Sequence, residues 1–434
     1  MAISSLSIIL IVLALLLVIG VPITYAIGIS ALCAIVQMVP VDISVSTAAQ
    51  RTFVGMSIFS LTAIPFFILA GNLMNQGGIA KRLVDLVLAV LGKMPGSLMV
   101  ANVGANALFG AISGSASAAA AAVGSMVKES EDDLDYDRAI CTATNGSSAP
   151  AGLLIPPSNA LITYSLVSGG TSVAALFLAG YLPGILWTIA CIVVALIIAK
   201  RKGYTALAGN FSWRFLGQAV LNAIPALSLI VVVIGGIVGG IFTATEGAAV
   251  SAVYALILSI CYRSITLKSF WQITLESAKM SAMVIFLIGV STILGWVMAF
   301  TMIPQGIAAA VLGLTQDPIM ILLIMNVVLL IAGTFMDVTP AILIFTPLFL
   351  PIVKSFGMSP VQFGLILVYN LCIGNITPPV GNTLFVAIKV GRTTLAKVMP
   401  YMLMYYTAIL VGLILVTYMP FLTLALPGMA GLLK

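Results

Sequence analysis

The sequence predicts a polytopic α-helical membrane protein made of two related halves, and three observations support this. Of the 434 residues, 62% are hydrophobic and only 7% are charged, a balance that soluble folds do not have. Apolar segments long enough to cross a bilayer recur along the whole chain. Two of these segments are interrupted by Pro-Pro pairs, in GLLIPPSNALI at 152–162 and in GNITPPVGNTLF at 374–385, about half the chain apart.

The apolar segments predict the helices in order. The first segment has no basic region ahead of it, so we expect a retained helix and not a signal peptide. Two segments are too long for one span and carry SGSAS and GTFMDVTP at their middles, so we expect re-entrant helical hairpins with tips at 113–117 and 333–340. The apolar segments fall at 4–20, 22–38, 52–75, 97–126, 138–168, 172–199, 216–240, 243–262, 277–302, 318–353, 360–391 and 397–427.

Each half then holds three spans, a hairpin and two more spans, which is an odd number of crossings. The second half is therefore expected to be inverted relative to the first, with both chain termini on the outer side of the membrane. With this orientation, 15 of the 18 Lys and Arg residues fall on the cytoplasmic side, as the positive-inside rule requires. These basic residues lie in loops near 81–93, 128–138, 200–214, 263–279 and 389–397.

Composition also excludes several kinds of chemistry. The chain has no His, which excludes Ser-His hydrolases, His-ligated metal centres and His proton relays. The five Cys residues are scattered through apolar segments in a pattern that fits neither disulfides nor a metal site. The acidic run KESEDDLDYDR at 128–138 is interpreted as a solvated cytoplasmic loop, with a partner contact as the less favoured alternative.

A break in a membrane helix costs free energy unless the exposed backbone N–H and C=O groups find a binding partner. Inverted repeats with discontinuous helices are typical of secondary transporters, where unwound carbonyls bind cations and half-helix N-termini bind anions. A packing kink would need only one Pro and would not explain matched positions in both halves. Neutral oxygen ligands favour Na⁺. The expected sodium-binding residues are Ser113, Gly114, Asn145, Gly146, Gly152, Ile155 and Ser158 in the first half, and Gly333, Thr334, Gly374, Thr377 and Val380 in the second.

Only two acids fall within predicted spans, Asp337 in TFMDVTP and Glu246 in TATEGAA. Acids inside a membrane are costly and are therefore candidates for function. Asp337 is expected at a hairpin tip, where a functional role is favoured over a local helix cap. Glu246 has two open readings, because TATEG is also typical of a helix start with an acid in its first turn.

The motifs resemble those of a known transporter family. GVPITYAIG, IPFFILAGNLM, GAISGSASAAAAAVGSM, GIFTATEGAAVSAVYAL and GTFMDVTPAILIFTPLFLPI, together with both Pro-Pro segments, are similar to the large membrane subunit of tripartite ATP-independent periplasmic (TRAP) transporters. The resemblance covers nearly the whole chain. It implies the inverted-repeat, elevator-type fold of the ion-transporter superfamily, Na⁺-coupled uptake of an organic acid, and no enzymatic activity. Na⁺ serves as the coupling ion, and no other cofactor is expected.

The resemblance also implies partners and a substrate site. We expect a separate small four-helix membrane subunit, a periplasmic substrate-binding protein and a location in the bacterial inner membrane. Because the span 280–302 contains no Lys or Arg, a C4-dicarboxylate or sugar acid is expected in place of sialic acid, bound through helix N-termini and hydroxyls. The expected substrate-binding residues are Ser115, Ser158, Asn159, Asp337, Asn382 and Thr383, with Glu246 as a further candidate.

The predicted organisation separates a scaffold from a transport unit. A passive anion channel, or a carboxylate carrier that works without a binding protein, is the alternative, and an intramembrane enzyme is less favoured because no second acid partners Asp337. The predicted regions are scaffold helices at 1–75, an interfacial arm at 76–93, transport regions at 94–170 and 303–392, a connecting helix and linker at 171–215, a second scaffold with its arm at 216–302, and a C-terminal helix at 393–434.

Overall fold

The computed structural model describes residues 2–92, 94–204 and 213–433, and the regular structure in these residues is entirely helical. Within the described residues, six helices are long and apolar enough to cross a membrane, and the pair α3 and α4, bent by 58° through η1 (Phe59–Thr62), can provide a seventh. The predicted polytopic helical membrane protein is therefore confirmed. The seven are α3 (Val41–Met56) with α4 (Ala63–Gln76), α11 (Val173–Lys202), α12 (Trp213–Val238), α13 (Ala244–Cys261), α14 (Leu267–Phe300), α17 (Val338–Ser355) and α20 (Leu395–Tyr418).

The remaining helices are shorter or less apolar, because Gly, Pro, capping and charged residues interrupt the apolar segments. Helices end and restart at both predicted hairpin tips and at both Pro-Pro pairs. The shorter helices are α1 (Ala2–Val18), α2 (Ile23–Ile35), α5 (Ile79–Leu91), α6 (Ser97–Ser113), α7 (Ala116–Asp133), α8 (Arg138–Ser148), α9 (Ala151–Leu154), α10 (Asn159–Val167), α15 (Ile303–Leu314), α16 (Pro318–Gly333), α18 (Pro360–Gly374), α19 (Asn382–Gly391) and α21 (Phe421–Met429).

The two hairpin turns are formed by different local devices. Between α6 and α7, Gly114 adopts a left-handed conformation (φ 62°) and the Ser115 hydroxyl accepts a hydrogen bond from the backbone N–H of Ala118 at 3.3 Å. Between α16 and α17, the Asp337 carboxylate accepts from the backbone N–H of Val338 at 2.9 Å. Each N-cap fixes the start of the returning helix, so each turn stays short.

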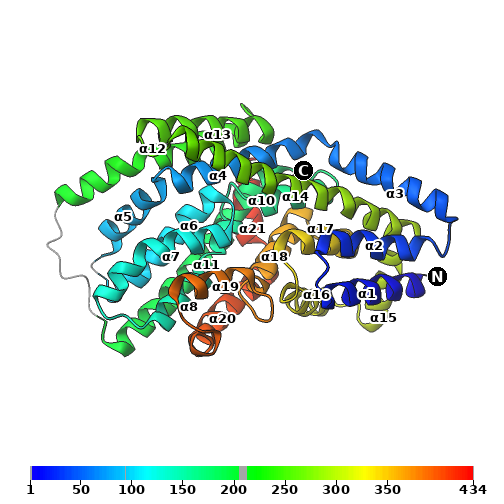
Figure 1. The fold of residues 1–434 in the computed structure, drawn as a ribbon. Coiled ribbons are helices and arrows are strands. Elements are labelled where there is room, and N and C mark those ends of the chain that lie inside the picture. Colours follow the sequence, from blue (N-terminus) through cyan, green and yellow to red (C-terminus); the bar gives the residue numbers. More distant parts are fainter. Residues whose placement is uncertain (1, 93, 205–212, 434) are drawn as a thin grey trace.

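The helices form two groups that meet along α4 and α14. In one group, α4 packs on α13, and α14 packs on α2, α3 and α4. In the other, α6 to α10 pack with α16 to α19, so that α19 from the second half lies against α7 and α8 from the first half. Figure 1 shows α12 and α13 along one edge of an elongated molecule, with α19 and α20 near the opposite edge. The contacts of α4 with α6 and of α14 with α17 join the groups.

Two expected segments differ in the structure. The apolar segment predicted at 277–302 begins earlier, at Leu267, as part of the continuous helix α14, because no Gly or Pro interrupts that helix before Gly289. The single C-terminal helix expected over 393–434 is divided into α20 and α21 at Met419 and Pro420, since the residue before a proline is driven out of the helical region. The predicted cytoplasmic loop 200–214 lies partly outside the described residues.

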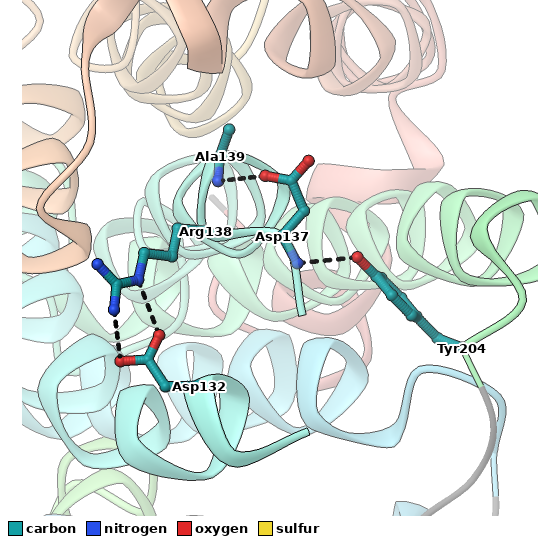
Figure 2. Close-up of polar contacts among 5 residues, drawn as sticks. All are labelled: Asp132, Asp137, Arg138, Ala139 and Tyr204. Carbon is teal, nitrogen blue, oxygen red and sulfur yellow. Dashed lines mark hydrogen bonds and ion pairs between the residues drawn. The ribbon is translucent and has the colours of Figure 1, made fainter. Parts of the chain in front are cut away.

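The acidic run 128–138 folds back on itself. Arg138 donates from Nε to Asp132 at 2.9 Å and from its terminal nitrogen to the second carboxylate oxygen at 3.2 Å (Figure 2). Asp137 caps α8 by accepting from the backbone N–H of Ala139 at 2.8 Å, and its own backbone N–H donates to the Tyr204 hydroxyl at 2.9 Å. The run is therefore tied to the end of α11, and only part of its charge is free for a partner.

Candidate functional site

The first broken helix lies where α9 meets α10. Gly152 touches the backbone of Gly110 on α6 so closely that any β-carbon at Gly152 would overlap it. After the cis Pro156–Pro157 bond, the Ser158 hydroxyl donates to the backbone carbonyl of Leu153 at 2.5 Å. The same hydroxyl accepts from the first turn of α10. The break is therefore fixed on one side by the close backbone contact of Gly152 with Gly110, here called a glycine crossing, and on the other side by the Ser158 cap.

The second broken helix repeats the glycine crossing. A β-carbon at Gly374 would overlap the backbone of Gly333, the last residue of α16. The backbone N–H of Val380, just past the cis Pro378–Pro379 bond, donates to the carbonyl of Thr334 at 3.1 Å. Hairpin tip and broken helix are therefore joined backbone to backbone. Gly333, Thr334, Gly374 and Val380, all expected around a cation, lie together here.

A cavity of about 590 Å³ lies between the two helix groups. This is within the usual size range of small-molecule sites. Its polar wall comes from hairpin one (α6 and α7), hairpin two (α16 and α17), α10 and α19, and its opposite wall is apolar. The apolar wall consists of Ile64 and Ile68 from α4 and Met280 and Val284 from α14, and the polar wall includes Ser115, Ser117, Asn159, Thr163, Asp337, Thr339, Asn375, Asn382 and Lys389.

Several predicted substrate residues meet at this cavity, namely Ser115, Asn159, Asp337 and Asn382. Each comes from a different helix start or hairpin tip, which is why they were far apart in the sequence. Gly114, expected at a cation site, also lines the cavity. The polar wall is therefore made at the interrupted ends of helices, where backbone groups lack intrahelical partners.

Three predicted substrate residues lie elsewhere. The Ser158 side chain is buried within the first break, and Thr383 is buried behind the cavity wall. Glu246 closes a capping box at the start of α13, where its carboxylate accepts from the backbone N–H of Thr243 at 2.8 Å and from the Thr243 hydroxyl at 2.9 Å. The geometry of Glu246 is that of a helix cap.

Asn145 and Gly146, expected as a further cation contact, lie inside α8. The Asn145 amide donates to the Ala120 carbonyl at 2.8 Å, and its oxygen accepts from Asn106 at 2.9 Å. A β-carbon at Gly146 would sit against Ala387 of α19. These two residues therefore pack α8 against α6, α7 and α19, apart from the two hairpin tips.

Lys389 is the charged residue at the cavity that sequence reasoning missed, and Thr163, Thr339 and Asn375 are neutral polar residues that it also missed. Lys389 lines the same wall as Asn382, seven residues earlier on α19, which places both on one face of the helix after about two turns. That spacing was readable in GNTLFVAIKV, but Lys389 had been counted only as a positive-inside residue. The span 280–302 contributes no Lys or Arg to the cavity, and the basic side chain that lines it comes from α19 instead.

A second polar cluster surrounds a small cavity of about 20 Å³, room for about one water molecule. Glu131, near the end of α7, is buried there beside Asn102 and Cys141, and one of its carboxylate oxygens has no hydrogen-bond partner among the described residues. Burial raises the pKa of Glu131 to about 7; the neighbouring Cys141 and Asn102 side chains oppose the rise, and the nearby Asp132 charge adds to it.

Comparison with known proteins decides the family. A family model described as "Tripartite ATP-independent periplasmic transporter, DctM component" matches residues 10–422. The chain belongs to this family. It is a DctM-like large subunit of a TRAP transporter, as its motifs indicated. It is therefore a multi-pass membrane protein of a secondary transporter class that transports organic acids.

Relatives of this TRAP large subunit carry several names. It is 48% identical over 414 residues to "Uncharacterized protein YgiK" of Salmonella typhimurium, covering 95% of each chain. It is 40% identical to the isethionate TRAP transporter permease protein DctMQ of Oleidesulfovibrio alaskensis, covering 96% of this chain and 65% of that one. It is also 40% identical to the C4-dicarboxylate TRAP transporter large permease protein DctM of Pseudomonas aeruginosa, covering 90% of this chain and 91% of that one.

Among solved structures, the fold is similar to that of the Alcanivorax borkumensis YdaH transporter, with a TM-score of 0.62 and 86% of each chain covered. Sequence identity to that chain is 14%, so this similarity concerns the fold alone. It agrees with the all-helical fold described above.

Proposed function

We propose that this TRAP large subunit is a Na⁺-coupled symporter that imports an organic acid, such as a C4-dicarboxylate or a sugar acid. The observation that carries the proposal is the cavity of about 590 Å³ whose polar wall is built from hairpin tips and broken-helix ends. Such ends present N–H groups to a carboxylate and carbonyl oxygens to a cation. The apolar wall opposite offers no polar group that would hold the substrate in place.

Two Na⁺ sites are proposed, one at each broken helix. Ser113, Gly152, Ile155 and Ser158 would form the first, and Gly333, Gly374, Thr377 and Val380 the second. Their support is the matched glycine crossing, which brings the backbone of a hairpin arm against that of a broken helix in both halves. Clustered carbonyl oxygens without an acidic side chain suit a monovalent cation.

The proposed mechanism is movement of one rigid unit across a scaffold. Hairpins, broken helices and both cation sites would move together, because the backbone bond from Val380 to Thr334 ties a hairpin tip to a broken helix. The scaffold would be the group that contains α2, α3, α4, α13 and α14. The smooth apolar wall of α4 and α14 supports this division, since side chains without hydrogen bonds can slide past the polar wall.

The proposed assembly includes a small four-helix membrane subunit and a periplasmic binding protein that delivers the substrate. The chain would lie in the bacterial inner membrane with inverted halves and both termini in the periplasm. The split of basic residues supports this orientation. An engineered Cys at Lys202 should react with an impermeant thiol reagent only after the cells are opened; reaction in intact cells would exclude the orientation.

Uptake into proteoliposomes tests the transport function. The large and small subunits with their binding protein should accumulate a radiolabelled carboxylate when an inward Na⁺ gradient is imposed, and should not do so with a K⁺ gradient. Uptake should saturate with substrate concentration, as expected of a carrier. Unsaturable flux that ignores the Na⁺ gradient would instead indicate a passive channel.

A further inference from the structure

The central cavity has one basic and one acidic side chain among its lining residues, Lys389 and Asp337. The other polar groups on its wall are neutral hydroxyls and amides. A charged substrate must therefore be recognised mainly by how its groups are distributed between these two side chains. A wall with one positive and one negative side chain favours a carboxylate with one charge over a carboxylate with two.

Two groups on the wall require hydrogen-bond donors. The Asp337 carboxylate receives a backbone N–H from Val338 and, when ionised, has further lone pairs that can only accept. The side-chain oxygen of Asn159 is buried and has no hydrogen-bond partner among the described residues, while its nitrogen end lies against hairpin one at Gly114. A substrate hydroxyl satisfies either group. A second substrate carboxylate would be repelled by Asp337.

Lys389 is placed to take a carboxylate. It is exposed on the cavity wall, and no carboxylate lies within ion-pair distance of it in the part of the chain that the structure describes. It lies seven residues after Asn382 on α19, about 10 Å along the helix axis, and both side chains line the cavity together with Asp337. The cavity therefore offers an extended small molecule one cationic and one anionic side chain.

We propose that Lys389 binds the substrate carboxylate and that the substrate is a hydroxylated monocarboxylate, whose hydroxyl groups donate to Asp337 and Asn159. This inference rests on the proposed function and narrows its substrate class. A simple dicarboxylate leaves the buried Asn159 acceptor without a donor and sets a charge against Asp337, so it binds more weakly. Lys389 as an ordinary interfacial lysine, with no ligand, is the opposing explanation.

Direct binding to the membrane protein tests this, because the binding protein's own selectivity does not enter. The full-length large subunit, purified with its small subunit in nanodiscs, is titrated with D-gluconate, D-glycerate, succinate and fumarate in NaCl and in choline chloride. The variants are Lys389→Gln, Lys389→Arg and Asp337→Asn. Lys397→Gln, which removes an exposed charge of the same predicted cytoplasmic loop away from the cavity, is the matched control.

The expected result is Na⁺-dependent binding of the hydroxy acids in preference to the dicarboxylates. Lys389→Gln should weaken that binding by about tenfold or more, as for loss of a charged hydrogen bond, while Lys389→Arg and Lys397→Gln stay near wild type. Asp337→Asn should narrow the gap between D-gluconate and succinate. Thermal unfolding of each variant shows that it remains folded.

The contrary outcomes are distinct. If the Lys389→Gln variant binds the hydroxy acids as tightly as the Lys397→Gln control does, the assignment of Lys389 is overturned. Na⁺-dependent binding of the dicarboxylates alone overturns the substrate class and leaves the proposed function standing. Absence of Na⁺-dependent binding by all four carboxylates overturns both this inference and the proposed function.

Discussion

The two broken helices share a backbone plan and differ in their surroundings. In both, a glycine of the broken helix touches the backbone of a hairpin arm, Gly152 against Gly110 and Gly374 against Gly333. The first break is enclosed, with Pro156, Pro157 and Ser158 all buried. At the second break, Thr377 and Pro378 are partly exposed, and Pro379 and Val380 are exposed.

The difference indicates that the backbone and the side chains have separate roles at the two breaks. The glycine crossing recurs because a β-carbon at Gly152 or at Gly374 would overlap the facing backbone. The side chains do not recur: both charged groups of the cavity, Asp337 and Lys389, belong to the second half. The shared backbone plan is thus suited to the proposed cation sites in both halves, and the charged side chains proposed to recognise the substrate belong to the second half.

Substitution of the crossing glycines should have the largest effect. Gly374→Leu and Gly152→Leu should each abolish Na⁺-driven uptake, because the new side chain meets backbone that cannot rotate away. Gly152→Ala should lower thermal stability more than Gly374→Ala, within the range of about 1 to 3 kcal/mol for overpacking, because its surroundings are fully enclosed. Equal uptake by either Leu variant and wild type would refute the proposed cation site at that break.

Asp337 tests whether recognition lies in the second half. Asp337→Asn keeps a helix N-cap and should still lower uptake by about tenfold or more, because a cavity acceptor that favours substrate donors is lost. Asp317→Asn is the matched control, since Asp317 caps the neighbouring helix α16 by accepting from Ile319 at 2.9 Å and does not line the cavity. If both variants take up substrate equally well, Asp337 is only a cap.

Glu131 lies near the end of α7, at the end of hairpin one that is away from its tip. Its raised pKa means that the folded protein favours the protonated carboxyl, so stability is lost as the pH rises from about 4.5 to about 7. Glu131→Gln should therefore have a higher free energy of unfolding than wild type at pH 8, by about 3 kcal/mol at most, and a nearly equal one at pH 5. A constant difference between the two proteins across this range would contradict the assignment.

Glu246 should show the smallest effect. Glu246→Gln weakens a capping box at the start of α13 and should cost about 1 kcal/mol or less. Uptake should be unchanged, since Glu246 does not line the cavity. A loss of Na⁺-driven uptake without a loss of stability would instead assign Glu246 a functional role.

The breaks could be predicted from sequence because Gly and Pro act locally. Gly114, the two Pro-Pro pairs and the capping residues Ser115 and Asp337 end or start helices by their own chemistry, whatever lies nearby. Family membership followed from the same motifs. The helix boundaries at 267 and 419 were missed where a cap or a single proline outweighed hydropathy.

The composition of the cavity was harder to predict. Lys389 reaches it because α19 packs against α7 and α8 of the other half, a contact that no local pattern records. Ser158 and Thr383 were expected there because they stand beside the Pro-Pro pairs, yet the helix turns their side chains inward. Which face of a broken helix meets the cavity is decided by tertiary packing.

The most direct test of the account is a reversible crosslink across the cavity. Thr339 on α17 and Val284 on α14 line opposite walls, and these two helices are in contact. With exposed Cys33 and Cys261 replaced by Ser, a disulfide between Thr339→Cys and Val284→Cys should stop Na⁺-driven uptake, and reductant should restore it. Uptake at the full rate by the crosslinked protein would show that the hairpin unit does not move against the scaffold.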